Sequence, residues 1–140
     1  MLNMYDIALD IATQAHKGQV DKNGVDYIEH PKYVSSLCDN SNEKIVALLH
    51  DVIEDTNITL DELSTYGFSS EILMAIDLLT KKEGVSRIDY LDSIKCNQLA
   101  KNVKIADLKH NSTISRYKQP TNKDIDKCCE YLQQLKYLMN

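Results

Sequence analysis

The stretch EKIVALLHDVIED, residues 43–55, carries the clearest indication of the fold. Its apolar residues recur at spacings of three and four, which is the period of an α-helix. The apolar stripe is broad, so we expect a helix that is buried on most sides. The residues of this stripe are Ile45, Val46, Ala47, Leu48, Leu49, Val52 and Ile53.

Helical patterns continue on both sides of this stretch. The 140 residues include only four glycines and two prolines, so breaks are few. Thr59, Ser69, Asn97 and Thr121 stand where helix N-caps are expected. The pattern predicts one all-α domain over residues 1–140, a bundle of about seven or eight helices. The expected helices are 4–17, 31–38, 43–55, 60–66, 70–79, 86–95, 98–114 and 122–139.

Charge and hydropathy exclude several classes of protein. The net charge of −5 argues against non-specific binding of nucleic acid, because a phosphate backbone requires a basic surface. No apolar run approaches the roughly 20 residues that span a bilayer, and none resembles a signal peptide. We therefore expect a cytoplasmic protein with no membrane partner.

Four side chains that bind metals or transfer protons close the stretch 43–55: His50, Asp51, Glu54 and Asp55. Burying carboxylates costs several kcal/mol or more unless they are paired, hydrogen-bonded or bound to a cation. The simpler alternative is a solvated acidic helix end. The helix dipole disfavours acids in a last turn, which favours a functional role for these residues.

A further carboxylate, Asp107, lies in VKIADLKHN at 103–111 and shares a helix face with Val103 and His110. An acid that faces the core needs a partner. An ion pair with Lys104 or Lys109 is the simpler explanation when Asp107 is considered alone. When Asp107 is considered together with His50 and Asp51, a bound metal ion becomes the favoured explanation.

A third segment of the sequence carries another candidate metal ligand, His30. It precedes Pro31, which suits the first turn of a helix and restricts the backbone before it. Imidazole and carboxylate ligands together favour a divalent transition ion such as Mn²⁺, Fe²⁺, Co²⁺ or Zn²⁺. His16, at the end of the first predicted helix, is expected near such a site without binding the ion itself.

Four strings carry a family resemblance: AHKGQ at 15–19, GVDYIEHP at 24–31, LLHDVIEDT at 48–56 and VKIADLKHN at 103–111. In order and separation they resemble the HD superfamily of metal-dependent phosphohydrolases. Within it, they are similar to the hydrolase domain of RelA/SpoT-type enzymes and of small stand-alone SpoT homologues. The resemblance covers residues 5 to about 117, most of the chain.

This resemblance implies an all-α HD domain with one bound Mn²⁺ and a nucleotide substrate. The implied roles are metal ligation by His30, His50, Asp51 and Asp107, acid/base catalysis or water orientation by Glu54 and Asp55, and nucleotide contact by Lys22 and Asn111. Two positions depart from the family pattern. Asp21 replaces the first of two basic residues near the substrate, and Ile114 replaces a threonine.

Three functional interpretations remain. The first is a (p)ppGpp hydrolase that releases pyrophosphate from the 3′ position of a guanosine nucleotide. The second is an HD-type phosphomonoesterase that acts on a nucleoside monophosphate or NADPH. The third is a non-catalytic module that binds a nucleotide. The resemblance also leaves room for a homodimer, although no exposed apolar stripe in the sequence demands one.

Overall fold

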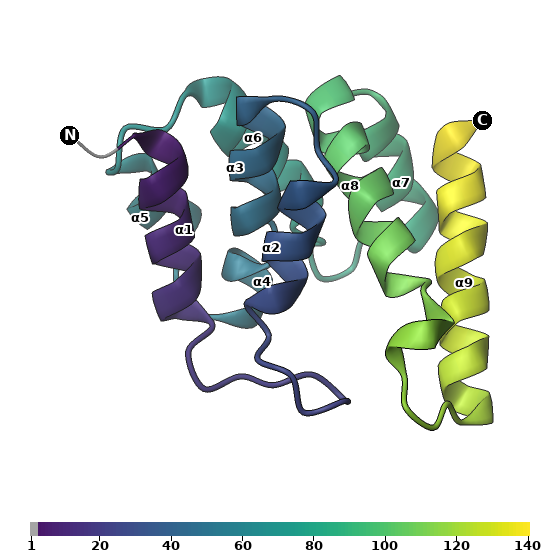
Figure 1. Ribbon diagram of the computed structural model, residues 1–140. Coiled ribbons are helices and arrows are strands. Elements are labelled where there is room, and N and C mark those ends of the chain that lie inside the picture. Colours follow the sequence, from purple (N-terminus) through teal and green to yellow (C-terminus); the bar gives the residue numbers. More distant parts are fainter. Residues whose placement is uncertain (1–2) are drawn as a thin grey trace.

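The computed structural model describes residues 3–140, and this part of the chain folds into nine α-helices and one 3₁₀ turn (Figure 1). Within it there is no strand, only an isolated bridge between Val20 and Asp26. The predicted all-α class is confirmed. The elements are α1 (Met4–Ala15), α2 (Glu29–Ser36), α3 (Ser41–Leu49), α4 (Val52–Asp55), α5 (Leu60–Ser64), α6 (Ser70–Leu79), α7 (Arg87–Lys95), α8 (Gln98–Asn111), η1 (Ile114–Arg116) and α9 (Asn122–Met139).

Local capping explains where several helices begin. The predicted N-caps Thr59, Ser69, Asn97 and Thr121 each accept a hydrogen bond from the backbone N–H three residues further on. Each cap satisfies a donor that the helix itself leaves free, and such caps typically contribute about 1 kcal/mol. These four predicted starts are therefore confirmed.

Helix α3 lies at the centre of the core, in contact with α1, α2, α6 and α8. Its residues from Ile45 to Leu49 are almost fully buried, as the broad apolar stripe predicts. Fully burying a leucine side chain is worth about 1.5–3 kcal/mol. The centre of the fold is thus fixed by the same stretch that ends in His50 and Asp51.

The predicted single helix over 43–55 is wrong at one point, because it is divided between α3 and α4. His50 Nδ1 donates to the carbonyl of Ala47, the oxygen that the amide of Asp51 would reach in a continuous helix. This division accounts for nine helices where about seven or eight were expected. Glu54 and Asp55 therefore do not end a long helix, and the dipole of such a helix does not act on them.

Helix α2 begins at Glu29, two residues earlier than predicted. His30 therefore lies inside the first helical turn instead of just before it. Pro31 follows within the same turn, where its missing N–H requires no partner. The imidazole of His30 is consequently carried by a regular helix rather than by a loop.

Helix α9 stands at the edge of the molecule beside α7 and α8 (Figure 1). Its buried face includes Cys128 and Leu138, whereas Ile125, Leu132 and Met139 are exposed. In the described part of the chain, no helix combines the length and the apolar character that a bilayer crossing requires.

Candidate metal centre

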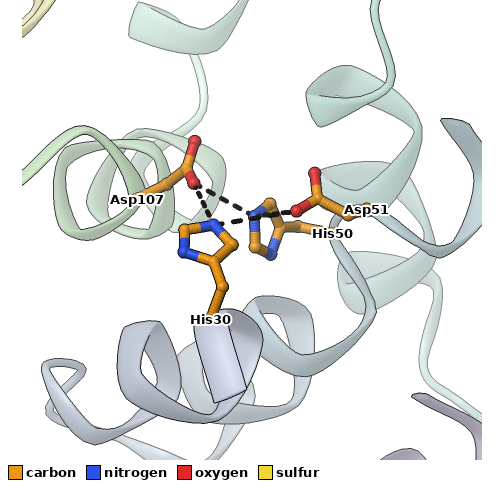
Figure 2. A group of neighbouring side chains, drawn as sticks. All are labelled: His30, His50, Asp51 and Asp107. Atoms are coloured by element: carbon orange, nitrogen blue, oxygen red, sulfur yellow. Dashed lines mark hydrogen bonds and ion pairs between the residues drawn. The ribbon is translucent and has the colours of Figure 1, made fainter. Parts of the chain in front are cut away.

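Three segments far apart in sequence bring His30, His50, Asp51 and Asp107 together (Figure 2). His30 comes from α2, Asp107 from α8, and the His50–Asp51 pair from the break between α3 and α4. Each residue offers one nitrogen or oxygen, and these four atoms all lie within 4.8 Å of one another. The cluster unites the residues that sequence analysis selected as metal ligands.

Both histidines direct Nε2 at the carboxylates. Asp107 Oδ1 lies 2.9 Å from His30 Nε2 and 3.2 Å from His50 Nε2. Asp51 Oδ2 lies 3.0 Å from His50 Nε2 and 3.7 Å from His30 Nε2. His30, His50 and Asp107 are buried, and Asp51 is partly buried.

Partners outside the cluster orient His50 and Asp51. The Nδ1–H of His50 donates to the Ala47 carbonyl, which leaves Nε2 facing the cluster. Burial lowers the pKa of His50, but the carboxylates of Asp51 and Asp107 outweigh it and raise the pKa well above its usual value. The phenol of Tyr27 donates to Asp51 Oδ2 over 2.7 Å. Burial and the nearby carboxylates Asp51 and Asp55 raise the pKa of Tyr27, so its hydroxyl stays protonated.

The carboxylate of Asp107 accepts hydrogen bonds from two other side chains of α8. Lys104 Nζ donates to Asp107 Oδ2 over 3.0 Å, and Asn111 Nδ2 donates to Asp107 Oδ1 over 3.1 Å. The predicted alternative, an ion pair between Lys104 and Asp107, is therefore present, but it engages the oxygen that does not face the histidines. Lys109, the other alternative, is exposed.

Electrostatics keep both carboxylates of the cluster ionised. Burial alone would raise the pKa of Asp51, but the adjacent His50 outweighs it and brings the pKa to about 2. Burial likewise opposes ionisation of Asp107, and Lys104 and His50 hold its pKa well below the usual range. Two ionised carboxylates and two imidazoles in a buried space form a donor set that suits a divalent transition metal ion.

A cavity of about 600 Å³ opens beside the cluster. Asp51, Asp107 and Tyr27 line it, together with residues of α7 and α9. Positive side chains line it as well: Arg87, Lys104 and Lys127. The cavity therefore combines the candidate metal ligands with cations that suit an anionic molecule.

Glu54 and Asp55, predicted as the acid/base pair, both line this cavity. The side chain of Glu54 accepts a hydrogen bond from the backbone N–H of Lys81. Burial, followed by the charges of Asp51 and Glu54, raises the pKa of Asp55. A carboxylate with a raised pKa exchanges protons more readily near neutral pH.

The two predicted nucleotide contacts differ in position. Asn111 lines the cavity beside Asp107. Lys22 instead forms an ion pair with Asp124 at the start of α9 and borders a different cavity together with Thr121. The structure therefore does not bring Lys22 into the cavity beside the cluster.

Asp21, which replaces a basic residue of the family pattern, has a structural role. Its carboxylate accepts from the backbone N–H groups of Asn23 and Val25 and lies 3.7 Å from a nitrogen of Arg116. The other departure, Ile114, lies in η1 and is exposed. The loop that carries Asp21 and Lys22 is thus held by ion pairs within the chain.

His16, which was expected near the site, is buried with its ring centroid 4.9 Å from that of Tyr27. Two features of the site were not predicted: Tyr27, whose hydroxyl donates to Asp51, and the part of the cavity lining that α9 supplies. Lys127, Tyr131 and Gln134 belong to this part of the lining, at helical spacing. The spacing was visible in the sequence, but the direction of this helix face was not.

No protein-family model matches the chain. Among curated proteins, it is 36% identical over 134 residues to a guanosine-3′,5′-bis(diphosphate) 3′-pyrophosphohydrolase of Borreliella burgdorferi, with 84% of this chain covered. A protein of the same name from Spiroplasma citri is 30% identical over 139 residues, again with 84% of this chain covered. The chain resembles the RelA/SpoT-type hydrolases. The resemblance inferred from the four strings is confirmed.

A relative from Mycobacterium leprae, named a probable GTP pyrophosphokinase, is 30% identical over 132 residues. The chain spans about a fifth of the length of these curated relatives. A solved structure, described as a metazoan ortholog of SpoT that hydrolyses ppGpp, superposes with a TM-score of 0.79 at 18% identity. The superposition covers all of this chain and 87% of the other, and it shows a shared fold.

Proposed function

We propose that this chain forms a metal-dependent phosphohydrolase domain whose substrate is (p)ppGpp, from which it releases the 3′-pyrophosphate. The observation that carries the proposal is the buried cluster of His30, His50, Asp51 and Asp107 at the wall of the cavity. The names of the curated relatives from Borreliella and Spiroplasma support the choice of substrate.

In this proposal the four side chains of the cluster hold one Mn²⁺. A bound divalent ion of this kind lowers the pKa of water and polarises a phosphoryl oxygen. Tyr27, Lys104 and Asn111 keep the carboxylates in place through the hydrogen bonds described above. The ionised state of Asp51 and Asp107 prepares both for ligation without a proton having to leave.

Glu54 and Asp55 act on the proton of the attacking water. Both carboxylates line the same cavity as Asp51 and Asp107, so they face the space in which a phosphoester would lie. The raised pKa of Asp55 suits a group that accepts a proton and later returns it to the leaving oxygen. Arg87, Lys104 and Lys127 supply positive charge for the phosphates within this space.

A substrate panel tests this function. Chelator-treated protein is reloaded with Mn²⁺ and incubated with ppGpp, NADPH or nucleoside monophosphates, and released pyrophosphate and orthophosphate are measured separately. We expect pyrophosphate from ppGpp. Asp107→Asn should abolish release, whereas Asp10→Asn, an exposed change on α1, should leave it unchanged.

The second candidate is a nucleotide phosphomonoesterase. The specific observation in its favour is the loop at Asp21 and Lys22, where one basic residue is absent and the other is paired with Asp124. This loop therefore lacks the free pair of basic residues that the family pattern places near the substrate. Orthophosphate as the sole product would refute (p)ppGpp hydrolysis and favour this second function. No product from any substrate, with Mn²⁺ bound, would favour a nucleotide-binding module.

A further inference from the structure

The outer nitrogen of His30 has a specific partner. While Nε2 of His30 faces Asp107, its Nδ1 lies 2.7 Å from Nδ1 of His110. The two residues are 80 positions apart, on α2 and α8. His110 itself contributes no atom to the cluster of four candidate ligands.

The two imidazoles meet at their edges. Their planes are inclined by only 12°, and their centroids are 4.9 Å apart although the two nitrogens are separated by 2.7 Å. Rings stacked face to face would not bring one pair of nitrogens so much closer than the centroids. The arrangement is therefore that of a nearly coplanar N–H···N hydrogen bond.

His110 is held on two further sides. The ring of Tyr33 packs against it with centroids 4.3 Å apart and planes inclined by 28°. Arg116 donates from Nη1 to the backbone carbonyl of His110 over 3.2 Å. The His110 ring thus packs against α2, and its backbone at the end of α8 is tied to η1.

We propose that His110 is a positioning residue of the metal centre, which fixes the tautomer and ring orientation of His30 through the Nδ1–Nδ1 hydrogen bond. The inference rests on the proposed metal-dependent function. It goes beyond that function, because it assigns a role to a residue outside the ligand set.

Proton counting gives the direction of this hydrogen bond. A neutral imidazole carries one N–H, and a nitrogen that binds a metal ion must offer a lone pair. If His30 binds through Nε2, its proton is on Nδ1, and His110 must accept at Nδ1 and carry its own proton on Nε2. An outer acceptor of this kind orients a metal-bound histidine and raises its basicity, and losing it typically lowers metal affinity about 10–100-fold.

Calorimetric titration of chelator-treated protein with Mn²⁺ tests the role. His110→Phe keeps a ring of similar shape against Tyr33 but removes the acceptor nitrogen. We expect its Kd for Mn²⁺ to rise about 10–100-fold, and His110→Asn, whose Oδ1 can replace Nδ1 as acceptor, to recover most of the affinity. Tyr33→Leu is the matched control, because it removes the packing and keeps the hydrogen bond.

Unchanged affinity of His110→Phe, or an equal loss in Tyr33→Leu, would overturn the role of His110. A wild-type protein that binds no Mn²⁺ would instead refute the proposed metal centre itself, so the two failures are distinguishable. If His110→Phe does not fold, ¹⁵N spectra of the imidazoles in Zn²⁺-loaded wild-type protein decide the question. The proposal requires the proton of His30 on Nδ1 and that of His110 on Nε2, and the opposite tautomers would overturn it.

Discussion

Asp107 joins the two histidines of the cluster, because its Oδ1 lies within hydrogen-bond distance of both Nε2 atoms. Lys104 engages its second oxygen. The roles of its two oxygens are thus divided, one facing the cluster and one neutralised by a cation. This explains how a second carboxylate is buried near Asp51 without the penalty of an unpaired charge.

The assignment of Glu54 and Asp55 is tested by neutral isosteres. In Glu54→Gln and Asp55→Asn we expect kcat to fall about 10²–10⁴-fold, the usual contribution of general acid–base catalysis. Affinity for Mn²⁺ should stay at the wild-type value, because neither carboxylate belongs to the cluster. Steady-state assays and calorimetry measure the two quantities.

Glu62→Gln is the matched control for this pair, since Glu62 is an exposed acid on α5 that does not line the cavity. An unchanged kcat in both isosteric variants would remove Glu54 and Asp55 from the reaction. A parallel loss of Mn²⁺ affinity would place them among the ligands instead.

Residue chemistry made part of the site predictable. Histidines and carboxylates on apolar helix faces need partners, and this requirement pointed to Asp107 and to the His50–Asp51 pair. Lys22 could not be placed in the same way, because its partner Asp124 lies 102 positions away. A surface cation gives no sign of which acid it will meet.

At the scale of elements, the start of α9 depends on Asp124. Its side chain accepts from the backbone of Thr121 and completes a capping box, and it also pairs with Lys22. The hydrogen bond from Lys22, followed by that from the Thr121 backbone, lowers the pKa of Asp124 to about 2. The ionised carboxylate therefore stabilises the folded state relative to the unfolded chain.

This lowered pKa predicts a pH dependence of stability. The contribution of Asp124 is complete above the unfolded pKa of about 3.9 and is lost as the pH falls towards the folded value of about 2. Asp124→Asn should be less stable than wild type at pH 6, and the difference should shrink between pH 4 and pH 2. Urea unfolding at a series of pH values measures it. A difference that stays constant over this range would contradict the role of the charge.

Helix starts were predictable because capping is local: Ser69, Asn97 and Thr121 each act within three residues of their own position. The break between α3 and α4 was not predictable from the sequence. It depends on the side chain of His50 competing for a backbone carbonyl, and helical periodicity continues through it unchanged. The exposure of Ile125, Leu132 and Met139 on α9 could not be predicted for a related reason, since periodicity does not show which side of an edge helix has a neighbour.

At the scale of the whole molecule, the cluster connects three parts of the fold. The ligand candidates come from α2, from the α3–α4 break and from α8, so a bound ion would link elements at the centre of the core. Binding to the folded chain alone must then stabilise it, because the unfolded chain does not bring His30 and Asp107 together.

Metal removal should therefore lower the melting temperature. At Mn²⁺ concentrations of about 100 times Kd, the expected gain is roughly 2.7 kcal/mol, which corresponds to a rise in Tm on the order of 10 °C for a domain of this size. Scanning calorimetry of chelator-treated protein with and without Mn²⁺ measures it. Asp107→Asn is the control and should show little rise. An equal rise in this variant would mean that Mn²⁺ stabilises the chain elsewhere.

The central claim is that four side chains from three segments hold one divalent ion. Anomalous diffraction from crystals grown with Mn²⁺, recorded near the manganese edge, tests it most directly. The account predicts a single strong peak about 2.0–2.3 Å from His30 Nε2, His50 Nε2 and one oxygen each of Asp51 and Asp107. A well-ordered cluster with no peak among these atoms, or a peak bound only by other residues, would contradict it.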